Sequence, residues 1–85
     1  MEKLSQMSNI GKELEKRLEE AGIMIPYELR ETGSRNAYLR INTYDAGACL
    51  HMLCALEGAI RSIRWLDLPK EVKSDLREFI KLKKV

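Results

Sequence analysis

The stretch Cys49-Leu-His-Met-Leu-Cys-Ala-Leu-Glu-Gly-Ala-Ile-Arg-Ser-Ile63 decides the fold of this 85-residue chain. Its apolar residues recur every three or four positions, the period of an α-helix, and one stripe consists of Cys49, Met52, Leu53, Leu56, Ile60 and Ile63. Leu50, Cys54 and Ala59 widen this stripe until the segment is apolar almost all round. A helix of this kind is buried on every side. We therefore expect it at the centre of the domain, with the other helices packed around it.

A first helix is expected from residue 10 to residue 21. Its apolar face consists of Ile10, Leu14, Leu18 and Ala21. Ser8 or Asn9 is the expected N-cap residue, because a short polar side chain can accept a hydrogen bond from the first turn. Gly22 is expected to end this helix, because glycine adopts the left-handed conformation of a C′ residue without steric cost.

Two shorter helices and a final one complete the pattern. Pro26 suits the first turn of a second helix that Gly33 closes, and Ser34 is the expected cap of a third helix that carries Ala37, Tyr38, Leu39 and Ile41. The longest gap between helices is expected at residues 43–47. The last helix starts near Pro69 and places its apolar face over the core, with Trp65 filling the space between it and the central helix. The prediction is a single all-α domain over residues 1–85, with about five helices.

Composition excludes several classes of protein. Apolar residues make up 45% of the chain and charged residues 33%, as in folded globular proteins. The net charge of +2 is far from that of a protein that holds nucleic acid by charge alone. The N-terminus has no signal-peptide pattern, and the longest uncharged stretch, residues 46–56, is too short to span a bilayer. We expect a cytoplasmic protein that is not inserted in a membrane.

The sequence positions of the two cysteines and of the histidine do not predict a reactive or metal-binding site. Cys49 and Cys54 are five positions apart on one helix and point in different directions, so they cannot share a metal or form a disulfide with each other. We expect both thiols to pack in the core, and His51 to be buried or at the boundary of the core. With no zinc spacing, nucleophile elbow or phosphate-cradling glycine motif, the sequence favours a protein that is not an enzyme and uses no cofactor.

Two glycine turns are the candidate contact points. Residues 9–12 (Asn-Ile-Gly-Lys) and 32–35 (Thr-Gly-Ser-Arg) each lead into a helix, whose unpaired N–H groups and positive dipole end suit a phosphate oxygen. Their faint similarity is the pattern of tandem helix-hairpin-helix units, which hold DNA without reading its sequence. The candidate nucleic-acid-binding residues are Asn9, Gly11, Lys12, Gly33, Ser34 and Arg35.

The alternative is that these turns only cap helices. Glu13 and Glu15 follow the first turn and Glu31 precedes the second, so negative charge lies where a phosphate would bind. The fuller helix-hairpin-helix pattern also has a glycine two positions earlier, where this chain has Asn9 and Glu31. The residues alone favour caps over phosphate binding.

Three segments resemble the C-terminal domain of the TfoX (Sxy) family of bacterial competence regulators. They are residues 9–18 with 21–23, residues 28–40, and residues 53–61 followed by Trp65 and 68–76, within a match from about Leu4 to Ile80. Glu57-Gly58-Ala59, leading to a tryptophan and Leu-Pro, is the most specific part. The resemblance implies a helix-hairpin-helix-like (SAM-domain-like) bundle and a role in assisting a DNA-binding regulator of DNA-uptake genes. It also implies an N-terminal α/β domain in full-length members, which has no counterpart in this chain.

Two functional hypotheses follow. The first is a regulatory module that touches DNA phosphates through the two turns, as an accessory to a transcription complex. The second is a protein–protein adaptor or homodimer that contacts a transcription regulator through exposed aromatic residues such as Tyr27, Tyr38 and Tyr44. The near-zero net charge and the glutamates beside the turns favour the second.

Overall fold

The computed structural model describes residues 3–44 and 49–83 of the chain, and these residues form helices and no strands. Five α-helices are α1 (Lys12–Glu20), α2 (Pro26–Thr32), α3 (Ser34–Tyr44), α4 (Leu50–Arg61) and α5 (Lys70–Lys83). Two short 3-10 helices, η1 (Leu4–Gln6) and η2 (Trp65–Asp67), precede α1 and α5. The prediction of an all-α protein with about five helices is confirmed. Of the gap expected at residues 43–47, residues 43 and 44 end α3, and 45–47 lie outside the described part.

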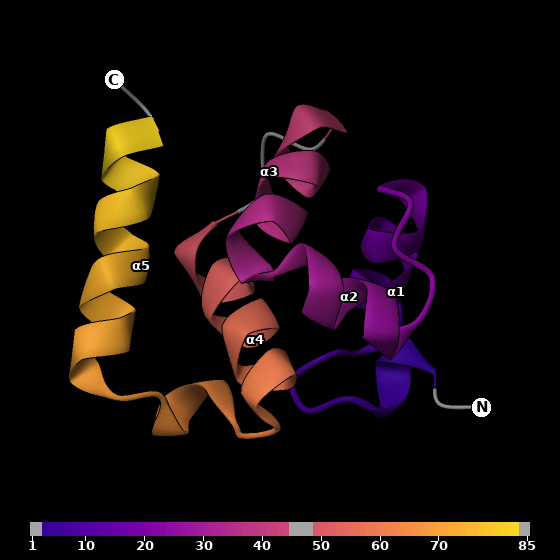
Figure 1. Cartoon of the computed structure of the whole chain (residues 1–85), viewed down its shortest axis with the longest axis horizontal. Helices are drawn as coiled ribbons and strands as arrows, with labels where there is room; N and C mark the ends of the chain where they lie inside the picture. The colour runs from indigo at the N-terminus through magenta and orange to yellow at the C-terminus, as the bar shows by residue number, and fades with distance from the viewer. Residues whose placement is uncertain (1–2, 45–48, 84–85) are drawn as a thin grey trace.

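The central position of α4 is confirmed. It contacts α3, α5 and η2, and Figure 1 shows it between α5 on one side and α1 and α2 on the other. Seven of its residues are buried: Met52, Leu53, Cys54, Ala55, Leu56, Gly58 and Ala59. Around them pack the buried side chains of the other helices, among them Leu18, Leu29, Ile41 and Leu76. A helix with so many buried apolar residues loses the most from contact with water, which explains its central place.

Gly22 ends α1 as the sequence predicts. It has a φ of +88°, and its N–H donates to the carbonyl of Glu19 at 3.0 Å. The N–H of Ile23 donates to the carbonyl of Leu18 at 2.8 Å, which completes a Schellman motif. Ile23 and Leu18 are both fully buried, so the turn is also fixed by apolar contacts. This turn directs the chain back across the core into α2.

A single residue separates α2 from α3. Pro26 is the first residue of α2, and Gly33 follows its last residue with a φ of +84°. The N–H of Gly33 donates to the carbonyl of Leu29, and the carbonyl of Gly33 accepts from the N–H of Ala37. Gly33 therefore ends one helix and starts the next, and its left-handed conformation produces the sharp change of direction between them.

Helix α5 covers one side of α4. Its inner face carries Val72, Leu76, Phe79 and Ile80, which pack against the core. The ring of Trp65 meets His51 of α4 edge-on, with the ring centres 4.6 Å apart, and the ammonium of Lys73 of α5 lies 6.0 Å from the centre of the tryptophan ring. The predicted position of Trp65 between the central and last helices is thus confirmed. No described helix has the length and apolarity needed to cross a membrane.

Candidate functional site

The first predicted turn is built around Asn9, whose side chain points into the molecule. Its amide nitrogen donates to the carbonyl of Ile63 at 2.9 Å and, more weakly, to the carbonyl of Ala55 at 3.4 Å. Its amide oxygen accepts from the backbone N–H of Trp65 at 3.0 Å. The prediction that Ser8 or Asn9 caps the first helix is wrong, because α1 starts at Lys12 with Gly11 as its N-cap residue and no side-chain cap.

Gly58 makes room for this side chain. A Cβ atom on Gly58 would lie 2.5 Å from the amide nitrogen of Asn9 and 2.8 Å from the carbonyl oxygen of Ile63. Neither distance is compatible with ordinary packing. The φ of Asn9 is +70°, a left-handed conformation that asparagine tolerates better than most residues. Asn9 and Gly58 therefore form one unit, the Asn9 latch, that fixes the N-terminal segment to the end of α4.

The second predicted turn is closed by a carboxylate of the same chain. The hydroxyl of Ser34 donates to Oε1 of Glu57 at 2.5 Å, and Ser34 is only 3% exposed. The prediction that Ser34 caps the third helix is wrong, because its hydroxyl turns to α4 and not to its own helix. Nε of Arg61 donates to Oε2 of Glu57 at 2.6 Å. Both oxygens of Glu57 are thus hydrogen-bonded.

Electrostatics hold Glu57 in its charged form. Burial alone would raise the pKa of this carboxyl, but the hydrogen bonds from Ser34 and Arg61 and the charges of Arg61 and Arg35 lower it. Arg35 also lies over the ring of Phe79, with the guanidinium carbon 5.9 Å from the ring centre. The carboxylate of Glu57 therefore interacts with Ser34 and Arg35, the residues expected to bind a phosphate at this turn.

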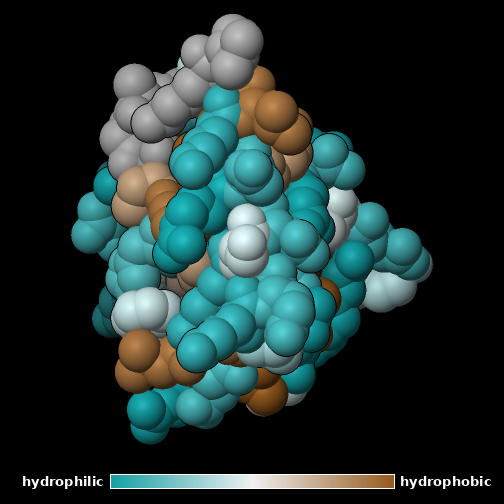
Figure 2. Space-filling model, turned by 90° about the vertical axis from the view of Figure 1, so that its left-hand side faces the viewer, coloured by the Kyte–Doolittle hydropathy of each residue, from teal (hydrophilic) through white to brown (hydrophobic). Residues whose placement is uncertain are grey.

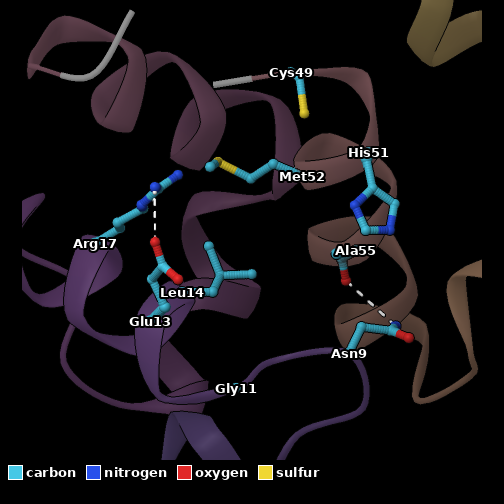
Figure 3. A pocket seen from close by; sticks show the side chains of 9 residues that line it. All are labelled: Asn9, Gly11, Glu13, Leu14, Arg17, Cys49, His51, Met52 and Ala55. Atoms are coloured by element: carbon cyan, nitrogen blue, oxygen red, sulfur yellow. Dashed lines mark hydrogen bonds and ion pairs between the residues drawn. The ribbon is translucent and has the colours of Figure 1, made fainter. Parts of the chain in front are cut away.

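A pocket of about 360 Å³ lies between α1 and α4 (Figure 3). Helix α1 supplies one wall and the first turns of α4 supply the other, while the loop that carries Asn9 and Gly11 closes one end. The lining residues are Asn9, Gly11, Glu13, Leu14, Arg17, Cys49, His51, Met52 and Ala55. On one wall NH2 of Arg17 donates to Oε1 of Glu13 at 3.0 Å, an i,i+4 pair on the surface of α1. The site combines an apolar floor with a few polar groups.

Of the two cysteines and the histidine that were expected in or beside the core, only Cys54 is buried. Cys54 is buried as predicted, and burial raises the pKa of its thiol. Cys49 is exposed at the N-cap position of α4, so its predicted place in the core is wrong. His51 is also exposed, and its ring meets that of Trp65. Among the residues described, no group of histidine, cysteine, aspartate and glutamate is arranged to hold a metal ion.

The six candidate residues of the two turns fall into two places. Asn9 and Gly11 line the α1–α4 pocket, and Lys12 beside them is exposed. Gly33, Ser34 and Arg35 lie at the junction of α2 and α3. A second, more polar hollow next to that junction is lined by Glu31, Thr32, Asn36, Leu39 and Arg40. Each turn thus adjoins a pocket of its own, and phosphate binding at either turn stays a prediction.

Comparison with known proteins supplies the family. The family model described as "TfoX C-terminal domain" matches residues 1–80. This chain belongs to the TfoX C-terminal domain family. Asn9 and Gly58 of the latch, and Ser34 and Glu57 of the second turn, all lie within the segments that carried the sequence resemblance.

Two solved structures of Listeria monocytogenes proteins share the fold of this TfoX C-terminal domain. One, an uncharacterized protein in a triclinic crystal form, is 47% identical, with a TM-score of 0.90 over 91% of this chain and 88% of that one. The other, a protein of unknown function in a tetragonal form, is 47% identical, with a TM-score of 0.88 over 89% of this chain and 93% of that one. No curated protein matches the chain.

Proposed function

We propose that this TfoX C-terminal domain is a non-enzymatic regulatory module that acts by binding a protein, such as the transcription regulator that the family resemblance implies. The single observation that carries the proposal is that Asn9 and Ser34, the uncharged polar side chains among the candidate residues of the two turns, are both hydrogen-bonded inside the domain. Asn9 is bound to the end of α4, and Ser34 is bound to Glu57. Groups already hydrogen-bonded to the protein must break those bonds before they can bind DNA phosphates.

The distribution of charge supports the same choice. Nucleic-acid-binding domains gather basic residues on one face, whereas this chain has a net charge of +2. Figure 2 shows the side formed by α5, which is largely hydrophilic. Its exposed residues mix both signs: Lys70, Glu71, Asp75, Arg77, Glu78 and Lys81. This face is a solvated surface with little net field to attract a polyanion.

Exposed apolar groups provide the complementary argument. Met24 and Tyr27, at the start of α2, are 54% and 64% exposed. Of the three tyrosines expected on the surface, Tyr27 is exposed, Tyr38 is buried against Phe79, which corrects its predicted role, and the side chain of Tyr44 lies outside the described part. Together with the α1–α4 pocket, these groups give the module surface suited to a protein partner.

The choice between DNA and protein is tested by titrating a fluorescent duplex with the purified chain at low salt. We expect no change in anisotropy up to high micromolar protein. Salt-sensitive binding that is lost in Lys12→Glu and kept in Lys81→Glu, the same charge change at an exposed site on α5, would overturn the proposal. Lys12 is the better probe than Arg35, because Arg35→Glu would also disturb Glu57.

Binding of a protein is tested by photo-crosslinking in the cells that express the chain. A benzoylphenylalanine at position 51, in the α1–α4 pocket, should form one discrete adduct that a probe at position 78 on α5 does not form. Mass spectrometry of the adduct then separates a transcription regulator from a second copy of the chain, the homodimer alternative. No adduct at position 51, at Met24 or at Tyr27 would contradict the proposal.

A further inference from the structure

We infer that the α1–α4 pocket receives a short segment of the partner that presents an apolar side chain followed by a carboxylate. The inference rests on the proposed function and specifies the chemistry of the partner. It combines three observations, namely the apolar floor of the pocket, the hydrogen-bond donors on its two walls, and the exposed ion pair at its rim.

The floor fits one aliphatic or aromatic side chain. Leu14 of α1 and Met52 and Ala55 of α4 form it, and Gly11 at the closed end has no side chain, with open space where a Cβ would stand. A volume of about 360 Å³ lies at the lower end of the range for ligand pockets, roughly 300–1,000 Å³. This is room for one large side chain and its neighbouring peptide groups. The phosphate backbone of a duplex has no apolar group to fill such a floor.

The walls supply donors for a carboxylate. Arg17 stands on the α1 wall and His51 on the α4 wall across the pocket (Figure 3). Arginine has five N–H donors in a planar fork that matches a carboxylate. The single carboxylate that lines the pocket, Glu13, binds this fork through one oxygen.

Glu13 is therefore an internal substitute for the acid of the partner. Its side chain is 82% exposed and that of Arg17 is 33% exposed, so their pair is the kind of surface ion pair that contributes about 0–1 kcal/mol. A second carboxylate can displace Glu13 from the guanidinium at little cost. Removal of the Glu13 charge should then strengthen binding of an acidic segment, which no purely structural role of Glu13 predicts.

The test uses capped tripeptides and amide resonances of the ¹⁵N-labelled chain. Acetyl-Leu-Glu-Gly-amide should shift the resonances of Gly11 and Ala55 at millimolar concentration. The Leu-Gln and Ser-Glu peptides should each bind about threefold or more weakly. Arg17→Gln should abolish the preference for Glu over Gln. Glu13→Gln should tighten the Leu-Glu peptide by about two- to threefold, and Glu19→Gln, the same change at an exposed site of α1 outside the pocket, should have no effect.

Three results would overturn the inference: no shift of Gly11 or Ala55 up to about 10 mM peptide, equal binding of the Glu and Gln peptides, or no gain in Glu13→Gln. Glu13→Gln changes a mostly exposed side chain, so its result does not depend on whether Arg17→Gln folds well. If the peptides fail while the crosslinker at position 51 still captures a protein, the pocket chemistry is wrong and the proposed function stands. If neither is observed, both are wrong.

Discussion

The side-chain amide of Asn9 occupies the space that a side chain at position 58 would need. A Cβ on Gly58 would lie 2.5 Å from the amide nitrogen, and that nitrogen donates to the carbonyl of Ile63 beside it. The glycine and the asparagine are 49 positions apart in the sequence, yet each restricts the other. A substitution at either position should therefore disturb the turn that leads from the end of α4 to Trp65.

Replacement of Asn9 should destabilise the domain strongly. In Asn9→Ala the carbonyl of Ile63 and the N–H of Trp65 lose their partner, and alanine must adopt the left-handed conformation. We expect a loss of about 2–4 kcal/mol in the free energy of unfolding, measured by urea denaturation. Asn36→Ala removes an amide that bonds only to the Thr32 carbonyl on the surface and should cost under about 1 kcal/mol. Equal losses would show that the latch has no special role.

Gly58→Ala should reverse the usual preference for alanine in a helix. Alanine normally gains about 0.5–1 kcal/mol over glycine there. Here the added methyl meets Asn9 and a backbone carbonyl, so we expect a net loss of about 1–3 kcal/mol. Gly11→Ala, where a Cβ meets nothing within 4 Å and φ is −92°, should be close to neutral. The double variant Asn9→Ala/Gly58→Ala should lose less than the sum of the single variants, because one of the clashing groups is gone.

Lowering the pH should decrease the free energy of unfolding, in part because the Glu57 carboxylate becomes protonated. The pKa of this carboxyl is lowered from its ordinary value of 4.5, so its contribution to stability is present above that value. The contribution is lost as the pH falls through the lowered pKa of the folded state. Urea midpoints of the parent should therefore drop more between pH 5 and strongly acid pH than those of Glu57→Gln. The control Glu78→Gln, on the outer face of α5, should keep the pH profile of the parent. If Glu57→Gln also keeps that profile, the Glu57 carboxylate does not contribute to stability.

The two thiols should react at very different rates. Cys49 is exposed, whereas Cys54 is buried and has a raised pKa, because burial disfavours the thiolate. We expect a thiol reagent to modify one cysteine of the folded protein rapidly and the second only in denaturant. Cys49→Ser should remove the fast phase. Rapid modification of Cys54 in folded Cys49→Ser would mean that the core around α4 opens readily.

Local patterns were sufficient to predict most of the fold. The central helix follows from the apolar period of residues 49–63 and extends from Leu50 to Arg61. Gly22, Pro26 and Gly33 mark the ends of helices because their backbone requirements are local and do not depend on the rest of the chain. In these places one residue and its neighbours determine the conformation.

The contacts that define the candidate site are not local, and the sequence did not reveal them. Asn9 resembles a helix cap by its neighbours, but its partners are 46 to 56 positions away. Ser34 likewise prefers Glu57 on another helix to its own backbone. Cys49 fits the apolar period of α4, which predicts a buried thiol, but it lies just before the first residue of the helix and is exposed. The one clue to the latch was Gly58, an otherwise unfavourable residue inside a helix.

The Asn9 latch also constrains the order of events during synthesis. Asn9 belongs to the first ninth of the chain, whereas the N–H of Trp65, which donates to the amide oxygen of Asn9, is made 56 residues later. The N-terminal segment must therefore wait, without the hydrogen bonds of the latch, until three quarters of the polypeptide has left the ribosome. Loop closure over this distance carries an entropic cost that local helix formation avoids. A nascent chain halted before residue 65 should remain open to proteases at its first turn, and release of the next few residues should close it.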